Sequence, residues 1–182
     1  MKKPRIQWVP FIATAVSFAI TLVAVSAPFL PPPPRVSDET LSLARVEKVR
    51  LEIAPLAAQL ANVGLSAKRI EADWREKLTA AGIKVANDDP QAPRLRLQTK
   101  ATDDEDLPGG TGFSSYLKLY QRVHVPRLNR KLEVPTFTYL MGGIENAEDL
   151  AAATQQSLDI VIIRFIEQVE LAGSALDDLE NY

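Results

Sequence analysis

Two stretches in which polar and apolar residues alternate constrain the fold more than any other feature of the chain. In RLRLQTKA (94–101), one parity holds Leu95, Leu97 and Thr99, and the other holds long polar side chains. SYLKLYQRVHVP (115–126) repeats the alternation after an acidic and then glycine-rich loop. Successive side chains of a strand point to opposite faces of a sheet. Both stretches are therefore predicted to be half-buried strands, with one face toward a core and the other toward solvent.

Three further segments have strand character. VRLEI (49–53) alternates apolar and charged residues, IKVA (83–86) is short, and KLEVPTFTYLM (131–141) is long. Proline cannot donate a hydrogen bond to a neighbouring strand. Pro135 therefore predicts that the last of these segments lies at a sheet edge or contains a bulge.

Two segments have the three- and four-residue spacing of amphipathic helices. The first, AKRIEADWREKLTAAG (67–82), follows Ser66, a favourable N-cap residue, and ends in a glycine that suits a helix C-terminus. The second runs from residue 146 to about residue 172. The apolar positions are Ile70, Trp74 and Leu78 in the first helix and Ala151, Thr154, Leu158, Val161, Phe165, Val169 and Ala172 in the second.

The order of these elements is β-α-β-β-β-β-α. It predicts a two-layer α+β sandwich in which two amphipathic helices cover one face of a mostly antiparallel sheet. We assign the domain to residues 41–173 and expect an acidic tail at 174–182. A hydrophobic helix is expected in front of the domain, within residues 1–27.

Charge and cysteine content limit the class of protein. The chain contains no cysteine, which excludes disulfides, thiolate catalysis, zinc–thiolate sites and lipid attachment to a cysteine. Four of the 21 basic residues lie in residues 1–36, so the remainder holds 17 basic against 23 acidic residues. An acidic domain is a poor general nucleic-acid binder, because phosphate contacts dominate such affinities. No nucleic-acid partner is therefore expected.

The N-terminus has the pattern of an export signal or a membrane anchor. MKKPR (1–5) is basic, and WVPFIATAVSFAITLVAV (8–25) has no charge. The apolar stretch is longer than the 7–15 residues of a signal-peptide core and approaches the ~20 needed to span a bilayer. Small residues at Ser26-Ala27 permit cleavage, although Pro28 would then follow the cut.

A proline-rich linker at 28–40 favours the anchor. Pro31 to Pro34 favour a polyproline II helix, which from Pro28 to Val36 would span about 28 Å. We therefore expect membrane attachment through the N-terminal segment, with the domain in the periplasm or outside the cell. The alternative is a soluble periplasmic or secreted protein, released by cleavage near Ser26-Ala27.

The segment GLSAKRIEADWREKLTAAGIKV (64–85) resembles one found in exported bacterial proteins of uncharacterised function. In those proteins a GLS turn precedes a helix that ends in AGI and a strand. The order of elements is also similar to that of small periplasmic α/β modules such as the N-terminal domain of TolB. The resemblance implies an envelope-facing binding or assembly module, and it carries over no catalytic residue.

Few residues suggest catalysis, and neither a metal nor a cofactor is predicted. His124 is the only histidine, and no serine lies in a G-x-S-x-G motif. Asp104 and Asp106 have the spacing of the first EF-hand ligands, but Pro108 and Ser115 occupy later ligand positions. A solvated acidic loop is the better interpretation.

Strand parity points to one candidate binding surface. If Leu95 and Leu97 face the helices, the opposite parity turns basic and aromatic side chains toward solvent. On the last strand, Phe137 and Tyr139 share a parity opposed to Leu132, Val134 and Leu140, and we expect the exposed face to show its tyrosines. Such a face suits anionic polymers or an acidic segment of a protein. The candidate residues are Arg94, Arg96, Lys100, Tyr116, Lys118, Tyr120, Arg122 and His124.

Charge asymmetry between two parts of the chain adds a further partner, a second copy of the same protein. Residues 145–182 hold nine acidic side chains and only Arg164 as a base, whereas residues 94–131 are predominantly basic. Neutralisation within one molecule is the simpler interpretation.

Three functions remain open from the sequence. The first is a non-enzymatic envelope module that binds a protein or an anionic envelope polymer. The alternatives are a small hydrolase, which carboxylates with perturbed pKa values in a cleft would favour, and a structural oligomer subunit.

Overall fold

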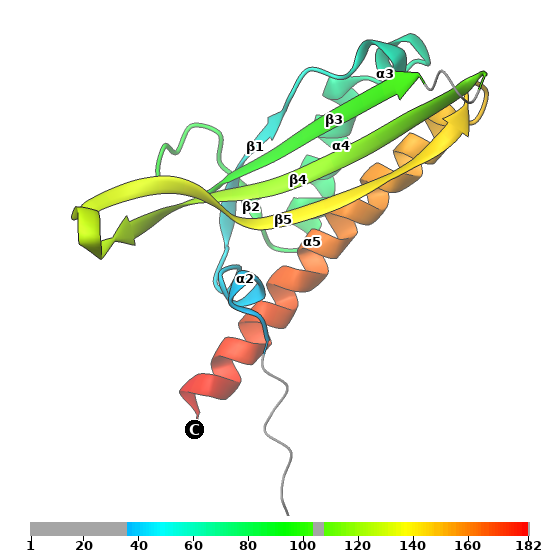
Figure 1. The fold of residues 1–182 in the computed structure, drawn as a ribbon. Helices are drawn as coiled ribbons and strands as arrows, with labels where there is room; N and C mark the ends of the chain where they lie inside the picture. The colour runs from blue at the N-terminus through cyan, green and yellow to red at the C-terminus, as the bar shows by residue number, and fades with distance from the viewer. Residues whose placement is uncertain (1–35, 104–107, 182) are drawn as a thin grey trace, which may run out of the picture. The chain divides into compact units, whose positions relative to one another are not determined.

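Five strands form one sheet in the order β2-β1-β3-β4-β5 in the computed structural model, which describes residues 36–103 and 108–181 (Figure 1). β1 pairs in parallel with both β2 and β3, and β3-β4-β5 is antiparallel. The sheet is therefore mixed, and the α+β class is confirmed. The strands are β1 Lys48–Ile53, β2 Lys84–Val85, β3 Arg94–Asp103, β4 Gly110–Val125 and β5 Arg130–Asn146.

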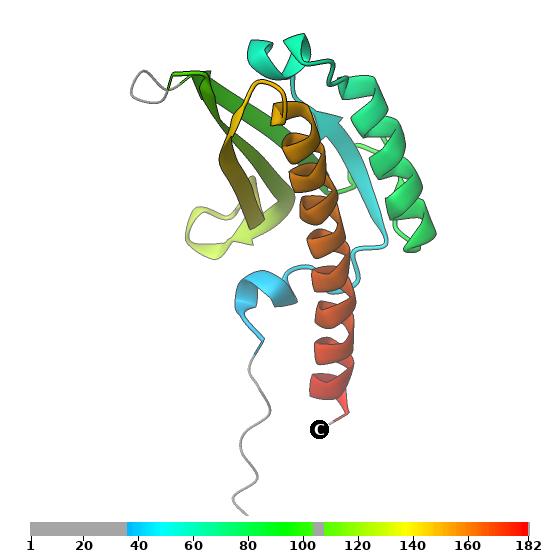
Figure 2. The ribbon, with the colours of Figure 1, turned by 90° about the vertical axis from the view of Figure 1, so that its right-hand side faces the viewer.

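Helices pack on one face of this sheet (Figure 2). They are α2 Asp38–Leu41, α3 Ala58–Asn62, α4 Ala67–Ala80 and α5 Leu150–Glu180. The predicted stripe of α4 is buried, and Gly82 follows the helix with a φ of 79°. Positive φ is costly for a residue with a Cβ, which explains a glycine at this stop. Ser66 occupies the N-cap position, but its side chain makes no capping hydrogen bond.

The last helix is longer than its apolar stripe predicts. α5 continues without a break to Glu180, through the segment where the sequence predicts an acidic tail. Its buried positions include Thr154, Leu158, Val161 and Phe165, as the spacing indicates. Beyond Ala172 the helix has no core to cover, so the apolar pattern ends although the helix does not.

The core lies between the sheet and the two long helices. Leu95, Leu97, Leu117 and Leu119 from the middle strands are fully buried together with Trp74. A leucine buried in this way contributes about 2 kcal/mol relative to an exposed one. The alternating apolar residues of β3 and β4 therefore face the helices, as the sequence predicts.

A lysine joins the two long helices at the edge of this core. Lys77 of α4 donates hydrogen bonds to Asp73, at 2.7 Å, and to Asp159 of α5, at 2.6 Å. Burial lowers the pKa of Lys77, but the two carboxylates raise it by more, so the net pKa lies above its ordinary value.

Strand β5 lies at the sheet edge and contains an irregularity, as Pro135 predicts. Leu119 pairs with Phe137 but Tyr120 pairs with Pro135, so Thr136 has no partner in the register. A bulge of this kind reverses the parity of the residues beyond it. Leu132 and Val134 therefore continue the helix-facing side that Phe137 and Tyr139 occupy, and the predicted opposition between the two pairs is wrong.

The expected membrane anchor at 8–25, its cleavage site and the linker prolines lie outside the described residues. Within the described ranges, no helix combines the length and the apolarity that a membrane span requires.

Candidate functional site

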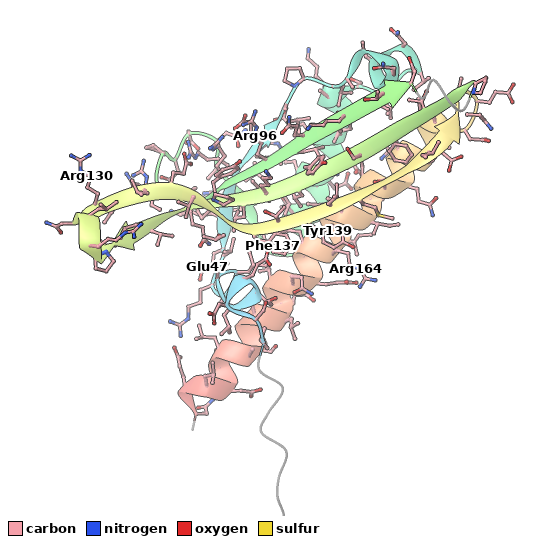
Figure 3. All side chains as sticks on the ribbon, in the orientation of Figure 1. Glu47, Arg96, Arg130, Phe137, Tyr139 and Arg164 are labelled. Carbon is pink, nitrogen blue, oxygen red and sulfur yellow. The ribbon has the colours of Figure 1, made fainter. Side chains whose placement is uncertain are left out.

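The second face of the sheet is not covered by any element of the described residues (Figures 1 and 3). We call this surface the open face. Register places Arg94 opposite Tyr120, Arg96 opposite Lys118, and Lys100 opposite Ser114, next to Tyr116. These residues alternate with the buried leucines of the same two strands, so one alternating pattern produces both the core and the open face.

Two cations lie over tyrosine rings on the open face. The guanidinium carbon of Arg94 is 4.3 Å from the ring centroid of Tyr120, and Nζ of Lys100 is 5.5 Å from that of Tyr116. Each contact is worth about 0.5–1 kcal/mol at an exposed position. It also holds the cation and the ring in a fixed orientation toward solvent.

Two carboxylates pair with arginines of this face and neutralise part of its positive charge. Glu52 on β1 accepts a hydrogen bond from Arg94 Nη1 at 3.0 Å, and its other oxygen lies 3.2 Å from Arg96 Nε. Glu133 on β5 accepts from Arg94 Nε and Nη2, both at 3.3 Å, and lies 3.5 Å from Arg50. The hydrogen bond that Arg94 donates to Glu52 is the main cause of the raised pKa of Arg94, and Glu133 adds to it.

The ion pairs leave part of the positive charge without a partner. Among the described residues, no carboxylate lies within ion-pair distance of Lys100, Lys118 or Arg122. Arg122 instead donates a 2.7 Å hydrogen bond to Gln91. Two carboxylates, Glu52 and Glu133, stand against five basic residues in this part of the face: Arg50, Arg94, Arg96, Lys100 and Lys118.

The structure separates the eight candidate residues into two groups. Arg94, Arg96, Lys100, Tyr116, Lys118 and Tyr120 lie together on the open face. Arg122 and His124 lie on a part of β4 that extends past the start of β3 and pairs only with β5. We call residues 121–134 the overhanging hairpin.

Strand β5 contributes different residues from those expected. Phe137 packs 5.8 Å from Phe165 of α5, ring centroid to ring centroid, and Tyr139 lies against the same core (Figure 3). The residues that β5 places on the open face are instead Leu140 and Ile144, which are 54% and 57% exposed. The open face is therefore basic and aromatic over β3 and β4 and apolar at its β5 edge.

Sequence reasoning missed the acidic members of the face. Arg50 and Glu52 share a parity in VRLEI, so alternation alone places them opposite Val49 and Leu51. No sequence pattern indicates that β1 lies beside β3 and brings Glu52 next to Arg94, because that neighbour relation comes from the parallel crossover.

Other kinds of site find little support in the described residues. Two surface hollows border α4 and the turn after it, and neither includes a residue of the open face. No group of three or more potential metal-ligating side chains lies together in the part of the chain that the structure describes. The calcium-like residues Asp104 and Asp106 fall outside that part.

Comparison with solved structures gives distant similarities. A minor lipoprotein from Acinetobacter baumannii is 16% identical, with a TM-score of 0.39 over 68% of this chain and 90% of that one. Rare lipoprotein B from Shewanella oneidensis is 12% identical, with a TM-score of 0.27 over 73% of this chain and 96% of that one. At such TM-scores neither similarity supports a functional argument. No protein-family model and no curated protein matches the chain.

Both similar structures are titled lipoproteins, whereas this chain has no cysteine to which a lipid could be attached. The predicted similarity to the N-terminal domain of TolB finds no support in these comparisons and stays a prediction.

Proposed function

We propose that residues 36–182 form a non-catalytic binding module of the cell envelope, whose open face holds an anionic partner. The observation that supports this most directly is a sheet face that no element of the described residues covers and that carries more basic than acidic side chains. Arg94 and Lys100 lie over tyrosine rings, an arrangement that fixes cations for contact with an extended anionic chain.

The N-terminal segment supports a location at the envelope. Residues 8–25 are uncharged and follow a basic end, and prolines separate them from the domain. We infer an uncleaved anchor with the domain on the far side of the inner membrane. Fractionation of cells followed by intact-mass measurement tests this: a membrane-bound product that retains Lys2 and Lys3 is expected, and a soluble product that begins near Ala27 would contradict it.

The hydrolase alternative has no specific support among the described residues. The one acidic group there with a shifted pKa is Asp89, whose pKa is lowered by a hydrogen bond from Lys48 in an exposed loop. A general acid needs the opposite shift, toward neutrality.

Binding of fluorescent polyglutamate and of polyphosphate to the full chain in a non-ionic detergent tests the proposal. Lys100→Gln with Lys118→Gln removes two charges that form no ion pair in the described structure. We expect this change to weaken binding by about three- to tenfold. Added salt should weaken binding to the unmodified chain as well.

A matched control distinguishes the open face from general charge. Lys68→Gln with Arg69→Gln removes the same charge from exposed positions of α4. We expect it to leave the affinity for each probe within about twofold of that of the unmodified chain, because a surface charge far from the binding site has little effect on affinity. Equal losses in the two variants, or no binding of either probe, would overturn the proposal. A preference for one probe would identify the partner as protein-like or phosphate-rich.

A further inference from the structure

A projecting part of the fold remains outside the proposed binding function. Residues 123–132, which we call the hairpin tip, extend beyond β3 at the end of the overhanging hairpin (Figure 1). The tip contains Arg127, Arg130 and Lys131, with His124 beside them and no acidic residue. No ion pair within the described residues involves these side chains.

The tip also exposes apolar side chains. Leu128 is 50% exposed, and Val123 and Leu132, which pair with each other, are 38% and 39% exposed. Arg130 extends from the turn into solvent (Figure 3). A strand pair that exposes both basic and apolar side chains has the composition of a contact surface rather than of a solvated loop.

The last turns of α5 have the complementary character. Residues 170–180, which we call the α5 end, contain Glu170, Asp177, Asp178 and Glu180 and no basic residue. Glu180 pairs with Arg45 at 2.6 Å, and no ion pair is formed by the other three within the described residues. Two exposed leucines accompany them: Leu179, at 60%, and Leu171.

Acidic residues at this position are unfavourable for an isolated molecule. The C-terminus of a helix carries partial negative charge, so carboxylates in its last turns are repelled and bases are preferred there. α5 has no base in its last turn. Leu171 and Leu179 add exposed apolar surface to the same turns, and both costs would fall if a basic and apolar surface covered the α5 end.

The hairpin and the α5 end both extend past the end of the sheet near which the segment 37–45 lies, the hairpin to the left and the α5 end downward in Figure 1. Gln121 at the base of the hairpin donates a hydrogen bond to the Ser42 carbonyl, and Arg45 binds Glu180 of α5. Within one molecule the basic tip and the acidic helix end do not pair, so internal neutralisation does not account for their opposite charges.

We propose that the occupant of these two surfaces is a second copy of this chain, with each hairpin tip packed on the α5 end of the other copy. Two surfaces of opposite charge that project from one end of a molecule allow both contacts to form around a single two-fold axis. A different partner would need an acidic surface to cover the hairpin tip and also a basic surface to cover the α5 end. The proposal does not depend on the open face, which stays accessible in such a dimer.

Because the chain contains no cysteine, cysteine crosslinking has no background. Two differently tagged full-length copies are mixed in a non-ionic detergent, one with Leu128→Cys and the other with Ser174→Cys, and a short bis-maleimide is added. Ser174 is an exposed residue of the α5 end. We expect a crosslink between the two tags. The control pairs Leu128→Cys with Ala72→Cys, an exposed position on α4, and should form little product.

Charge reversal tests the reason for the contact. Asp177→Lys with Asp178→Lys in the Ser174→Cys copy should lower the crosslink yield by about tenfold. Arg127→Glu with Arg130→Glu in the other copy should restore it. All four side chains are exposed. Far-UV circular dichroism verifies that each variant is folded.

Three results would overturn the proposal: no crosslink between the copies, equal yield from the Ser174 and Ala72 pairs, or a yield that charge reversal does not change. If no crosslink forms, binding of the full chain to phosphatidylglycerol vesicles is measured. Loss of that binding in Arg127→Glu with Arg130→Glu would make an anionic lipid surface the partner of the tip. None of these results bears on Lys100 and Lys118, so failure here is distinct from failure of the proposed function.

Discussion

The two faces of the β3–β4 pair differ in what determines their residues. Toward the helices, Leu95, Leu97, Leu117 and Leu119 fill a closed core. Toward solvent, Arg94 lies over the ring of Tyr120 and pairs with two glutamates, and no element of the described residues packs over them. The covered face therefore sets stability, whereas the open face is free to set affinity. Substitutions in neighbouring residues of one strand should separate the two roles.

The largest difference is expected between Leu117 and Lys118, which are adjacent on β4 and point to opposite faces. Leu117→Ala removes a fully buried side chain and should lower the free energy of unfolding by about 3 kcal/mol. Lys118→Ala should change it by no more than about 0.5 kcal/mol. Urea unfolding of the full chain, followed by far-UV circular dichroism, measures both. Similar losses would mean that the open face is covered in solution.

Gly142 lies on the open face, yet we expect its substitution to destabilise the protein. A Cβ at Gly142 would lie 2.2 Å from the carbonyl oxygen of Phe113 on the neighbouring strand. Gly142→Ala must therefore shift the β4–β5 pairing, and we expect a loss of about 2 kcal/mol in the same unfolding experiment.

Gly173 of α5 supplies the opposite control, since nothing lies within 4 Å of a Cβ added there. Gly173→Ala should raise the stability by about 0.5–1 kcal/mol, because alanine loses less backbone freedom in a helix. If both Gly142→Ala and Gly173→Ala destabilised the protein, the loss at Gly142 could not be attributed to the close contact between β4 and β5.

The covered face contains polar groups whose removal should be favourable. The hydroxyls of Thr99 and Ser115, which lie opposite each other on β3 and β4, are buried and have no hydrogen-bond partner among the described residues. Thr99→Val keeps the side-chain shape and removes the hydroxyl, so stability should rise by about 1 kcal/mol. A loss of stability would show that the hydroxyl is hydrogen-bonded in solution, through a water molecule for example.

A small effect on stability is also expected from the carboxylates of the open face. Glu52 and Glu133 are about two-fifths exposed, so Glu52→Gln with Glu133→Gln should cost no more than about 1 kcal/mol. The same change should strengthen binding of polyglutamate, because Arg94 and Arg96 are released from their ion pairs. Weaker binding would mean that the glutamates orient the arginines for the partner rather than compete with it.

Local patterns predicted the elements well, for reasons that particular residues illustrate. Ile70, Trp74 and Leu78 fall on one side of α4 by spacing alone, and all three are buried. Pro135 indicated an edge strand or a bulge, because a missing N–H has the same consequence in any fold, and β5 has both features. Arg94, Lys100, Tyr116 and Tyr120 were assigned to one face by parity, and the register brings them together.

The errors arose where the position of one element depends on another. Phe137 and Tyr139 face the core rather than the open face, because the apolar side of β5 is chosen by its pairing with Leu119 and Leu117. The bulge at Thr136 then places Leu132 and Val134 on the same side. Glu52 was overlooked because its neighbour across the sheet comes from a strand about 40 residues further along the chain.

The sequence by itself indicated the five strands and the two long helices, the side of β3 and β4 that is buried, and the absence of any thiol chemistry. Each of these depends on periodicity or residue type, which are local properties. Only the tertiary structure decided that Glu52 and Glu133 neutralise part of the open face, that the β4–β5 hairpin overhangs the sheet, and that the acidic end of α5 extends past the core. Strand order, register and helix packing create these neighbours, and they are fixed by the free energy of the whole core rather than by any single segment.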